Sequence, residues 1–211
     1  MRIDVSGYTA QRENRMLLKK IDTLTRSFQL VAIFNGHDGD ETVEYLAKHF
    51  ATELEVQLNI LDTTIQDALT VTFEKIDLYL LFEMIGQSGS TCVMALMEEG
   101  TFDMWCAHIG DSRMNIGDAI VTKDHTPISE IDRIRDSRGI HGRGGWVDSR
   151  GYLLGKIGVS RSFGDHEFKQ RPRQSKKQSS DMIIATPTIS HHAMSPGDVV
   201  TLANGTVKID Y

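Results

Sequence analysis

The sequence predicts an α+β protein in which helices pack on antiparallel β-sheets. Helical periodicity is concentrated in one block, residues 40–80, whereas most later apolar segments are short runs joined by tight glycine-containing turns. Such runs are typical of antiparallel strand pairs. No linker or internal repeat interrupts the 211 residues, so we expect a single domain over 1–211.

The first apolar segment, residues 31–34, predicts a strand that ends in Asn35-Gly36-His37. Asp40 is the expected N-cap of the helix that follows. A second helix is predicted to begin at Thr63, with Gln66 completing a capping box. Their apolar stripes are typical of core-facing helices, and they consist of Val43, Leu46, Ala47, Phe50, Leu54 and Leu58, then Ile65, Leu69, Phe73, Ile76 and Leu80.

Strand signals dominate the rest of the chain. Residues 90–97 and 101–109 flank a turn near Gly100, and residues 113–121 predict a tighter hairpin about Gly117-Asp118. A short helix is expected to open at Ser129 and Asp132, and the segments MIIATPTI and DVVTLANG are predicted to be strands. Cys92 and Cys106 are interpreted as reduced thiols in the core.

Composition excludes several classes of function. A net charge of −6 gives no reason to expect nucleic-acid binding, and no apolar run is long enough to span a membrane. The N-terminus has no signal-peptide pattern. We therefore expect an intracellular protein, cytoplasmic or nuclear, with a monomeric domain.

Four segments carry polar groups at the predicted strand ends. They are VAIFNGHDG, GSTCVMAL with AHIGDSR, TKDHTP and GVSRSFGDHEFK. In this order they resemble the metal-dependent protein serine/threonine phosphatases of type 2C, over roughly residues 7–205. That family carries Asp-Gly-His-Gly-Gly, Gly-Ser-Thr, Gly-Asp-Ser-Arg, Asp-His-x-Pro and Ser-Arg-x-x-Gly-Asp. The resemblance implies an α-β-β-α sandwich of two antiparallel sheets flanked by helices, here C-terminally shortened.

The resemblance also implies the site. In the family, two Mg²⁺ or Mn²⁺ ions share a bridging water that attacks phosphorus, and aspartates at strand ends hold the ions. The metal positions fall on Asn14, Asn35, Gly36, Asp111, Asp165 and Asn204. His37 matches the general acid, here vestigial, and Glu13 is kept. Thr9 stands where the family has a phosphate-holding arginine, and Asp124 of the Asp-His-x-Pro motif persists.

Three of these metal positions carry an amide in place of a carboxylate. An amide has the shape of a carboxylate without its charge, and it adds an NH₂ donor where acceptors are needed. We therefore predict a pseudophosphatase that acts as a binding or regulatory module, with no metal cofactor and with a kinase or phosphoprotein as partner. The alternative is an active Mg²⁺- or Mn²⁺-dependent phosphatase that uses Glu13, Asp111 and Asp165. A structural subunit, or a chain whose ligands were changed deliberately, also fits the pattern.

Other conspicuous residues receive structural interpretations. The basic segment from Lys169 to Ser180 is expected to be a solvated loop, or a docking surface for an acidic partner. Arg113 and Arg161 are expected to form ion pairs rather than to hold phosphate. Two further expectations are that Trp105 and Trp146 pack against the sheets and that His191-His192 is solvated.

Overall fold

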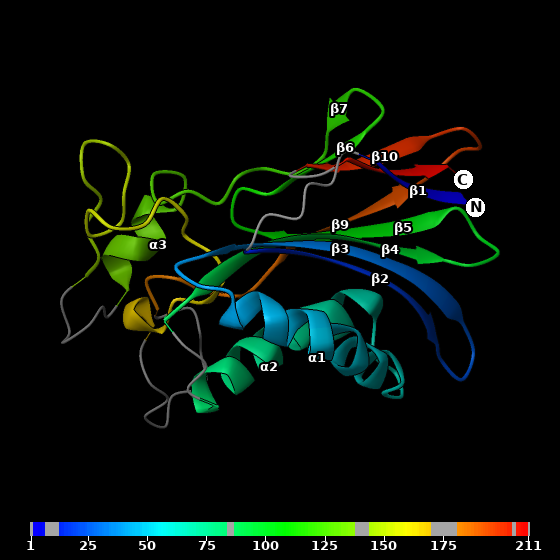
Figure 1. The fold of residues 1–211 in the computed structure, drawn as a ribbon, viewed down its shortest axis with the longest axis horizontal. Helices are drawn as coiled ribbons and strands as arrows, with labels where there is room; N and C mark the ends of the chain where they lie inside the picture. Colours follow the sequence, from blue (N-terminus) through cyan, green and yellow to red (C-terminus); the bar gives the residue numbers. More distant parts are fainter. Residues whose placement is uncertain are drawn as a thin grey trace.

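Two antiparallel β-sheets lie face to face, and helices cover the outer face of one of them (Figure 1). This computed structural model describes residues 2–6, 13–83, 87–137, 144–169, 181–203 and 206–210. The elements are β1 (Arg2–Ser6), β2 (Asn14–Asp22), β3 (Ser27–His37), α1 (Glu41–Leu58), α2 (Ile65–Phe82), β4 (Gly89–Glu98), β5 (Asp103–Ile109), β6 (Arg113–Ile116), β7 (Ala119–Ile120), α3 (Ile131–Asp136), β8 (Phe163–Gly164), the 3₁₀ turn η2 (His166–Phe168), β9 (Thr188–Ala193), β10 (Val199–Ala203) and β11 (Thr206–Asp210).

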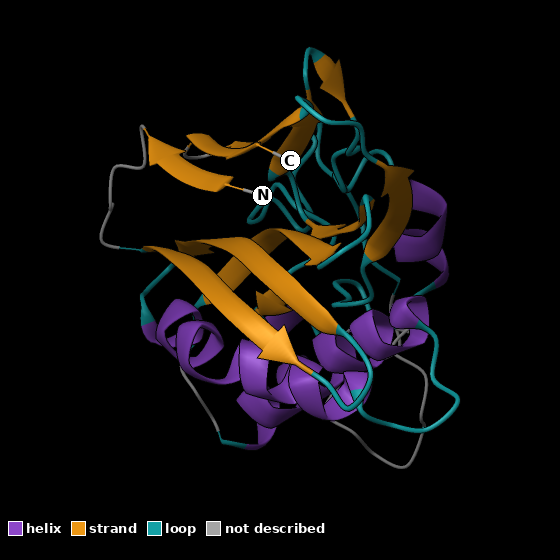
Figure 2. Cartoon of the chain, turned by 90° about the vertical axis from the view of Figure 1, so that its right-hand side faces the viewer, coloured by secondary structure: helices purple, strands orange, loops and turns teal. Residues whose placement is uncertain are grey.

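The strand order confirms the predicted two-sheet architecture. Sheet A runs β1-β11-β10-β6-β7, and sheet B runs β2-β3-β4-β5-β9 with β8 paired to β4. Helices α1 and α2 pack on sheet B, and both views place them on the side away from sheet A (Figures 1 and 2). In the described part of the chain, α1 and α2 form the helical layer of the sandwich. The short α3 lies apart from them, at one end of the two sheets.

Alternation along β3 produces two separate apolar layers. Leu30, Ala32 and Phe34 point to the helices, where they pack with Phe50 and Phe73. The intervening residues of β3 point to sheet A and join a second cluster, which includes Val31, Ile33, Met114, Val200 and Leu202. Nearly all of β4 is buried because it lies between these two layers. The even and odd residues of each central strand therefore face different environments.

Helices α1 and α2 form where the periodicity predicts them, but their N-terminal caps differ from the predicted ones. The predicted stripe of α1 is buried at Val43, Leu46 and Phe50, although Asp40 makes no side-chain cap hydrogen bond. The N-cap of α2 is Thr64, not Thr63: its hydroxyl accepts from the Asp67 amide at 3.0 Å and donates to the Asp67 carboxylate at 2.7 Å. The cap therefore lies one residue later than predicted, and the Asp67 carboxylate contacts the Thr64 hydroxyl rather than the backbone amide that a capping box uses.

Several expectations about the later segments are wrong. Glu130, not Ser129, is the N-cap of α3, and Ser129 Oγ instead accepts from the Thr126 amide at 3.0 Å. The strand predicted from residue 182 begins only at Thr188. His191 and His192 lie within β9; His191 is exposed, as predicted, and its Nε2 lies 2.6 Å from Asp103 Oδ1, whereas His192 is half-buried.

The predictions for the two cysteines are confirmed, whereas only one of the two tryptophans is buried as predicted. Trp105 is buried as predicted, whereas Trp146 is 55% exposed. Both cysteines are free and buried, which confirms that they are core thiols. The register pairs Ala95 with Cys106, so the two thiols do not lie directly opposite each other.

The start of the basic segment is part of the core. Lys169 is buried and donates to Asp77 of α2 at 2.6 Å and to the Ser162 carbonyl at 2.9 Å. The same Asp77 oxygen accepts from the Gly164 amide at 3.0 Å. Lys169 is therefore not a solvated residue, and residues 170–180 lie outside the described part of the chain.

Candidate functional site

Three polar residues form a row across neighbouring strands at one end of sheet B. The register places Asn14 of β2 opposite Asn35 of β3, and Asn35 opposite Thr91 of β4. Directly paired residues share one face of a sheet, and Asn35 is in phase with Val31 and Ile33, so the row faces sheet A. The strand register therefore places two of the predicted metal positions, Asn14 and Asn35, side by side, and both carry amides.

The chain around Gly36 is held close to β2. The Gly36 amide donates to the Glu13 carbonyl at 2.8 Å, and a Cβ at Gly36 would lie 2.5 Å from that carbonyl oxygen. The Glu13 carboxylate accepts from the Gly39 amide at 3.3 Å. Glycine is thus required at position 36 for this approach, which places Glu13 beside the strand tip.

His37 and Asp165 form the central ion pair of the site. Both carboxylate oxygens of Asp165 lie 2.9 Å from His37 Nε2, and Ser162 donates a further hydrogen bond to the carboxylate. Asp165 is buried and lies in the left-handed region at φ 52°. A Cβ at Gly89 would lie 2.3 Å from both His37 Nε2 and Asp165 Oδ2, so glycine at position 89 leaves the space for the pair.

The surroundings of His37 favour its protonated form. Burial lowers the pKa of His37, but the hydrogen bond and charge of Asp165, together with Asp38 and Asp111, outweigh burial and raise the pKa above its ordinary value. The Asp165 carboxylate therefore favours the imidazolium form of its partner. The metal-ligand role of Asp165 stays a prediction.

A cleft of about 520 Å³ opens beside this pair. The strand ends contribute one wall, which consists of Asn35, Gly36, His37, Asp38, Thr91 and Asp111. The loops around α3 and before β8 contribute the other wall, including Thr126, Arg150 and Lys156. The cleft is thus lined by acids, amide and hydroxyl groups on one side and by cations on the other.

The remaining predicted site residues divide into three groups. Asp111 is exposed and lines the cleft, as expected for a ligand position. Asp124 is held by Arg113, whose Nε and Nη2 donate to its two oxygens at 2.9 and 2.6 Å, which confirms the structural interpretation of Arg113. Thr9 and Asn204 lie outside the described residues.

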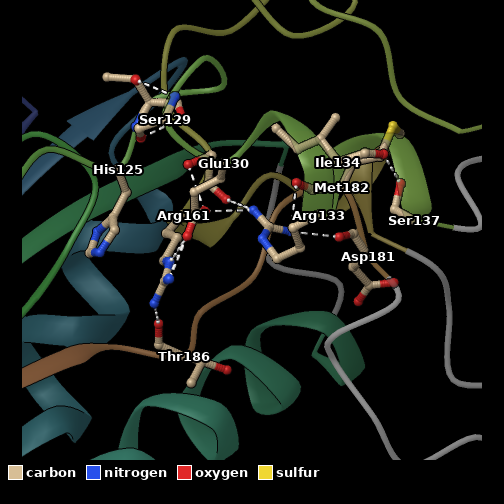
Figure 3. Close-up of polar contacts among 12 residues, drawn as sticks. His125, Ser129, Glu130, Arg133, Ile134, Ser137, Arg161, Asp181, Met182 and Thr186 are labelled. Carbon is tan, nitrogen blue, oxygen red and sulfur yellow. Dashed lines mark hydrogen bonds and ion pairs between the residues drawn. The ribbon is translucent and has the colours of Figure 1, made fainter.

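A buried network around Glu130 supports the loop wall (Figure 3). Arg161 Nε and Arg133 Nη2 donate to the two Glu130 oxygens at 2.9 and 2.7 Å, and Ser160 adds a hydrogen bond at 2.8 Å. Arg161 also donates to the Thr186 carbonyl at 2.8 Å. Burial raises the pKa of Glu130, but the two arginines outweigh it and lower the pKa to about 2. Arg161 is therefore structural, as predicted.

His125 is buried next to this network in a neutral form. Its Nε2 lies 2.8 Å from Thr188 Oγ1, its ring stacks on His108 at 4.6 Å, and its Nδ1 has no partner among the described residues. Burial, with the charge of Arg161 and the neighbouring His108, lowers the pKa of His125 to about 3.

This burial predicts acid sensitivity. The unfolded chain takes up a proton at His125 as pH falls below 6.5, whereas the folded chain does not until about pH 3, so stability is lost across that window. At pH 5 the loss from this group is about 2 kcal/mol. Urea unfolding at pH 7.5 and pH 5 is therefore expected to reveal a smaller pH-dependent loss for His125→Gln than for the parent. The exposed His49→Gln is the control, and equal losses in the parent and His125→Gln would contradict the assignment.

The residues of the site differ in how clearly the sequence marks them. Thr91 belongs to the Gly-Ser-Thr segment named above, and its position is defined by its pairing with Asn35 and by its contact with Ser112 Oγ at 2.7 Å. Arg150 and Lys156 lie in a glycine-rich stretch whose path depends on side-chain contacts rather than on periodicity. Ser162 is three residues before Asp165, a spacing that marks a local turn and could have been found.

Comparisons with known proteins agree with this geometry. The family model described as protein phosphatase 2C matches residues 4–205. A probable protein phosphatase 2C 4 of Paramecium tetraurelia is 31% identical over 194 residues, which cover 83% of this chain and 61% of that protein. A probable protein phosphatase 2C 10 of Arabidopsis thaliana is 33% identical, with 83% of this chain and 59% of that protein covered. The chain thus spans about three fifths of the length of these relatives.

Solved structures share the fold. A phosphatase from a pathogenic strain of Toxoplasma gondii has a TM-score of 0.70 at 19% identity, with 95% of this chain and 74% of that chain covered. A Caenorhabditis elegans sex determining protein has a TM-score of 0.71 at 22% identity, with 95% and 50% covered.

Proposed function

The chain belongs to the protein phosphatase 2C family, and we propose that it keeps the cleft of that family as a regulatory binding module without metal-dependent hydrolysis. In the family, Mg²⁺ or Mn²⁺ activates the water that attacks the phosphate group. A non-hydrolysing member of this kind would bind a phosphorylated protein or a kinase.

The adjacent amides of Asn14 and Asn35 carry this proposal. They occupy directly paired positions at the strand ends, where the family places carboxylates. Two dications bring four positive charges, and neutral amides offset none of them. Asn14 is only 5% exposed, so water does not easily replace the missing charge there. The donor set does not fit a two-metal centre.

The contacts of Asp165 support the same conclusion. Both of its carboxylate oxygens lie 2.9 Å from His37 Nε2, so His37 already occupies this carboxylate, and the pair favours the protonated form of the ring. Ser162 occupies a further lone pair of Asp165. A metal ion at this carboxylate would compete with both partners.

One observation favours an active enzyme as the second candidate. Asp111 is exposed toward the cleft, and the Glu13 side chain lies beside the strand tip, so two carboxylates are kept near the amide row. With Asp165 they would form a reduced ligand set for one or two ions.

Hydrolysis assays separate these two functions. We expect no Mn²⁺-dependent hydrolysis of p-nitrophenyl phosphate or of a phosphothreonine peptide above the background without protein. An active phosphatase 2C, assayed under the same conditions, is the positive control. Turnover by this chain that requires Mn²⁺ and is abolished by Asp111→Asn would contradict the proposed function and support the enzyme.

A further inference from the structure

The loop wall of the cleft carries an arrangement that the metal site does not explain. Residues 144–159 form a compact loop, in which Leu153 is fully buried and bridges to both Val147 and Ile157. Leu153 belongs to the same cluster as Ile134 of α3 and Phe168. The loop is therefore anchored in its own small core while Arg150 and Lys156 line the cleft.

Arg150 is pre-organised by a single aspartate. Asp148 Oδ2 accepts from Arg150 Nε and Nη2 at 3.0 and 2.9 Å, and Asp148 Oδ1 accepts from the backbone amides of Arg150 and Tyr152 at 2.9 Å each. The aspartate thus engages one edge of the guanidinium. Nη2 also donates a long hydrogen bond to the Gly155 carbonyl at 3.4 Å, whereas no hydrogen bond in the described part of the chain involves Nη1, and the side chain is 69% exposed. A guanidinium fixed on one edge retains a second edge suited to an oxyanion.

The mouth of the cleft on this side is apolar. Ile128 and Tyr152 line it and are 61% and 41% exposed. Gly151 lies between them at φ 89°, and a Cβ there would approach Ile128 Cδ1 to 3.0 Å. The guanidinium of Arg150 lies over the Tyr152 ring at 5.2 Å. An exposed aromatic, an arginine and an aliphatic side chain together are typical of protein-binding hot spots.

The charges of the two walls decide where an anion would lie. On the strand wall, Asp38 and Asp111 repel an anion, and the charge of His37 is directed to its partner Asp165, whereas Arg150 and Lys156 on the loop wall attract an anion. Lys156 is paired with Glu167 at 2.7 Å in an exposed ion pair, which water weakens and a dianion could replace. An anion is therefore favoured at the loop wall.

We propose that Arg150 and Lys156 hold a phosphate monoester of a protein segment without metal, while Ile128 and Tyr152 contact the residue next to it. The inference rests on the proposed function, because it assigns to the metal-free cleft a phosphorylated ligand. Arg150 Nη1 donates to one phosphate oxygen, Nη2 exchanges its long bond to the Gly155 carbonyl for a second, and Lys156 donates to a third. This loop site takes the place of the arginine that Thr9 does not supply.

Titration of ¹⁵N-labelled protein with phenyl phosphate in EDTA tests the site. We expect saturable chemical-shift changes, and Arg150→Gln and Lys156→Gln are each expected to weaken binding about tenfold, the equivalent of one charge-assisted hydrogen bond. Arg26→Gln and Lys75→Gln remove similarly exposed, ion-paired cations away from the cleft and are expected to leave binding unchanged. Ile128→Ser is expected to weaken phenyl phosphate but not inorganic phosphate.

The outcomes distinguish this inference from the proposed function. Binding in EDTA that is unaffected by Arg150→Gln and Lys156→Gln would overturn the loop site and leave the proposed function standing. If phenyl phosphate does not bind either in EDTA or in Mn²⁺, the loop site is overturned and the proposed function is left standing. Binding that appears only with Mn²⁺, accompanied by hydrolysis, would overturn both. A phosphoserine peptide with a neighbouring leucine that binds more tightly than its unphosphorylated form would support a protein ligand.

Discussion

Replacing Asn14, Asn35 and Asn204 together by aspartate is expected to raise the affinity for Mn²⁺ by at least about 100-fold. A unit charge about 4 Å from a dication contributes on the order of 2 kcal/mol even in a water-like dielectric, and three charges are added. Asn14 and Asn35 are direct strand neighbours, so the two new carboxylates would face the same ion. Isothermal titration calorimetry of the triple variant beside the parent measures the change.

The new charges should also destabilise the metal-free triple variant. Two carboxylates at paired positions repel each other, and the one at position 14 is buried. Mn²⁺ should therefore raise the midpoint of thermal unfolding of the triple variant much more than that of the parent. Asn59→Asp with Asn115→Asp adds two charges outside the cleft and is the control. No gain in metal affinity over this control would mean that the ligand positions are misplaced.

Turnover is expected to recover less than metal binding. Thr9, which stands where the family has an arginine, cannot make a bidentate contact with phosphate. Loss of such a clamp typically costs several kcal/mol of transition-state stabilisation. Robust hydrolysis of p-nitrophenyl phosphate by the triple variant would indicate that the three amides alone prevent catalysis.

Replacing Glu130 by glutamine is expected to destabilise the fold by about 3–5 kcal/mol. The glutamate side chain is 13% exposed and neutralises Arg133 and Arg161, which are themselves mostly buried. Glutamine keeps the size but leaves two guanidinium groups without their counter-charge. The midpoint of urea unfolding measures the effect. Glu44→Gln, which removes an exposed ion pair with Arg15, is the control and is expected to cost no more than about 1 kcal/mol.

The same glutamate makes the stability of the fold sensitive to acid over a second, lower pH range. Because the pKa of Glu130 is lowered to about 2, its contribution is complete above about pH 4.5 and is lost as pH falls from 4.5 through 2. Glu130→Gln should therefore lose less stability than the parent over that range. A cost below about 1 kcal/mol at pH 7 would contradict the role assigned to the network.

Periodicity predicted those parts of the fold that depend on local sequence. Contacts repeat every few residues along the apolar stripes of α1 and α2 and along the hairpin between β4 and β5. The pattern of apolar residues was therefore sufficient to predict these elements. The exposed Trp146 and the buried Lys169 were misjudged for the opposite reason. Lys169 is buried by its contact with Asp77 of α2, which is distant in the sequence, and no local pattern specified that contact or the exposure of Trp146.

The residues of the candidate site also fall into two groups, those whose position follows from the local sequence and those placed by long-range packing. Asn35, Gly36 and His37 end a strand, so their position at the sheet edge follows from the sequence. The pairing of Asn14 with Asn35 and of His37 with Asp165 depends on strand register and on a left-handed turn, which long-range packing determines. Arg150 and Lys156 reach the cleft only because Leu153 anchors their loop, a contact outside any motif.

Calorimetric titration of the unmodified protein with Mn²⁺ tests the central claim most directly. With neutral amides at Asn14 and Asn35 and with Asp165 bound to His37, binding is expected to be no tighter than millimolar, a free energy of about −4 kcal/mol. A saturable two-site isotherm at micromolar affinity, about −8 kcal/mol per site, would contradict the pseudophosphatase assignment and establish a metal centre built from the remaining carboxylates.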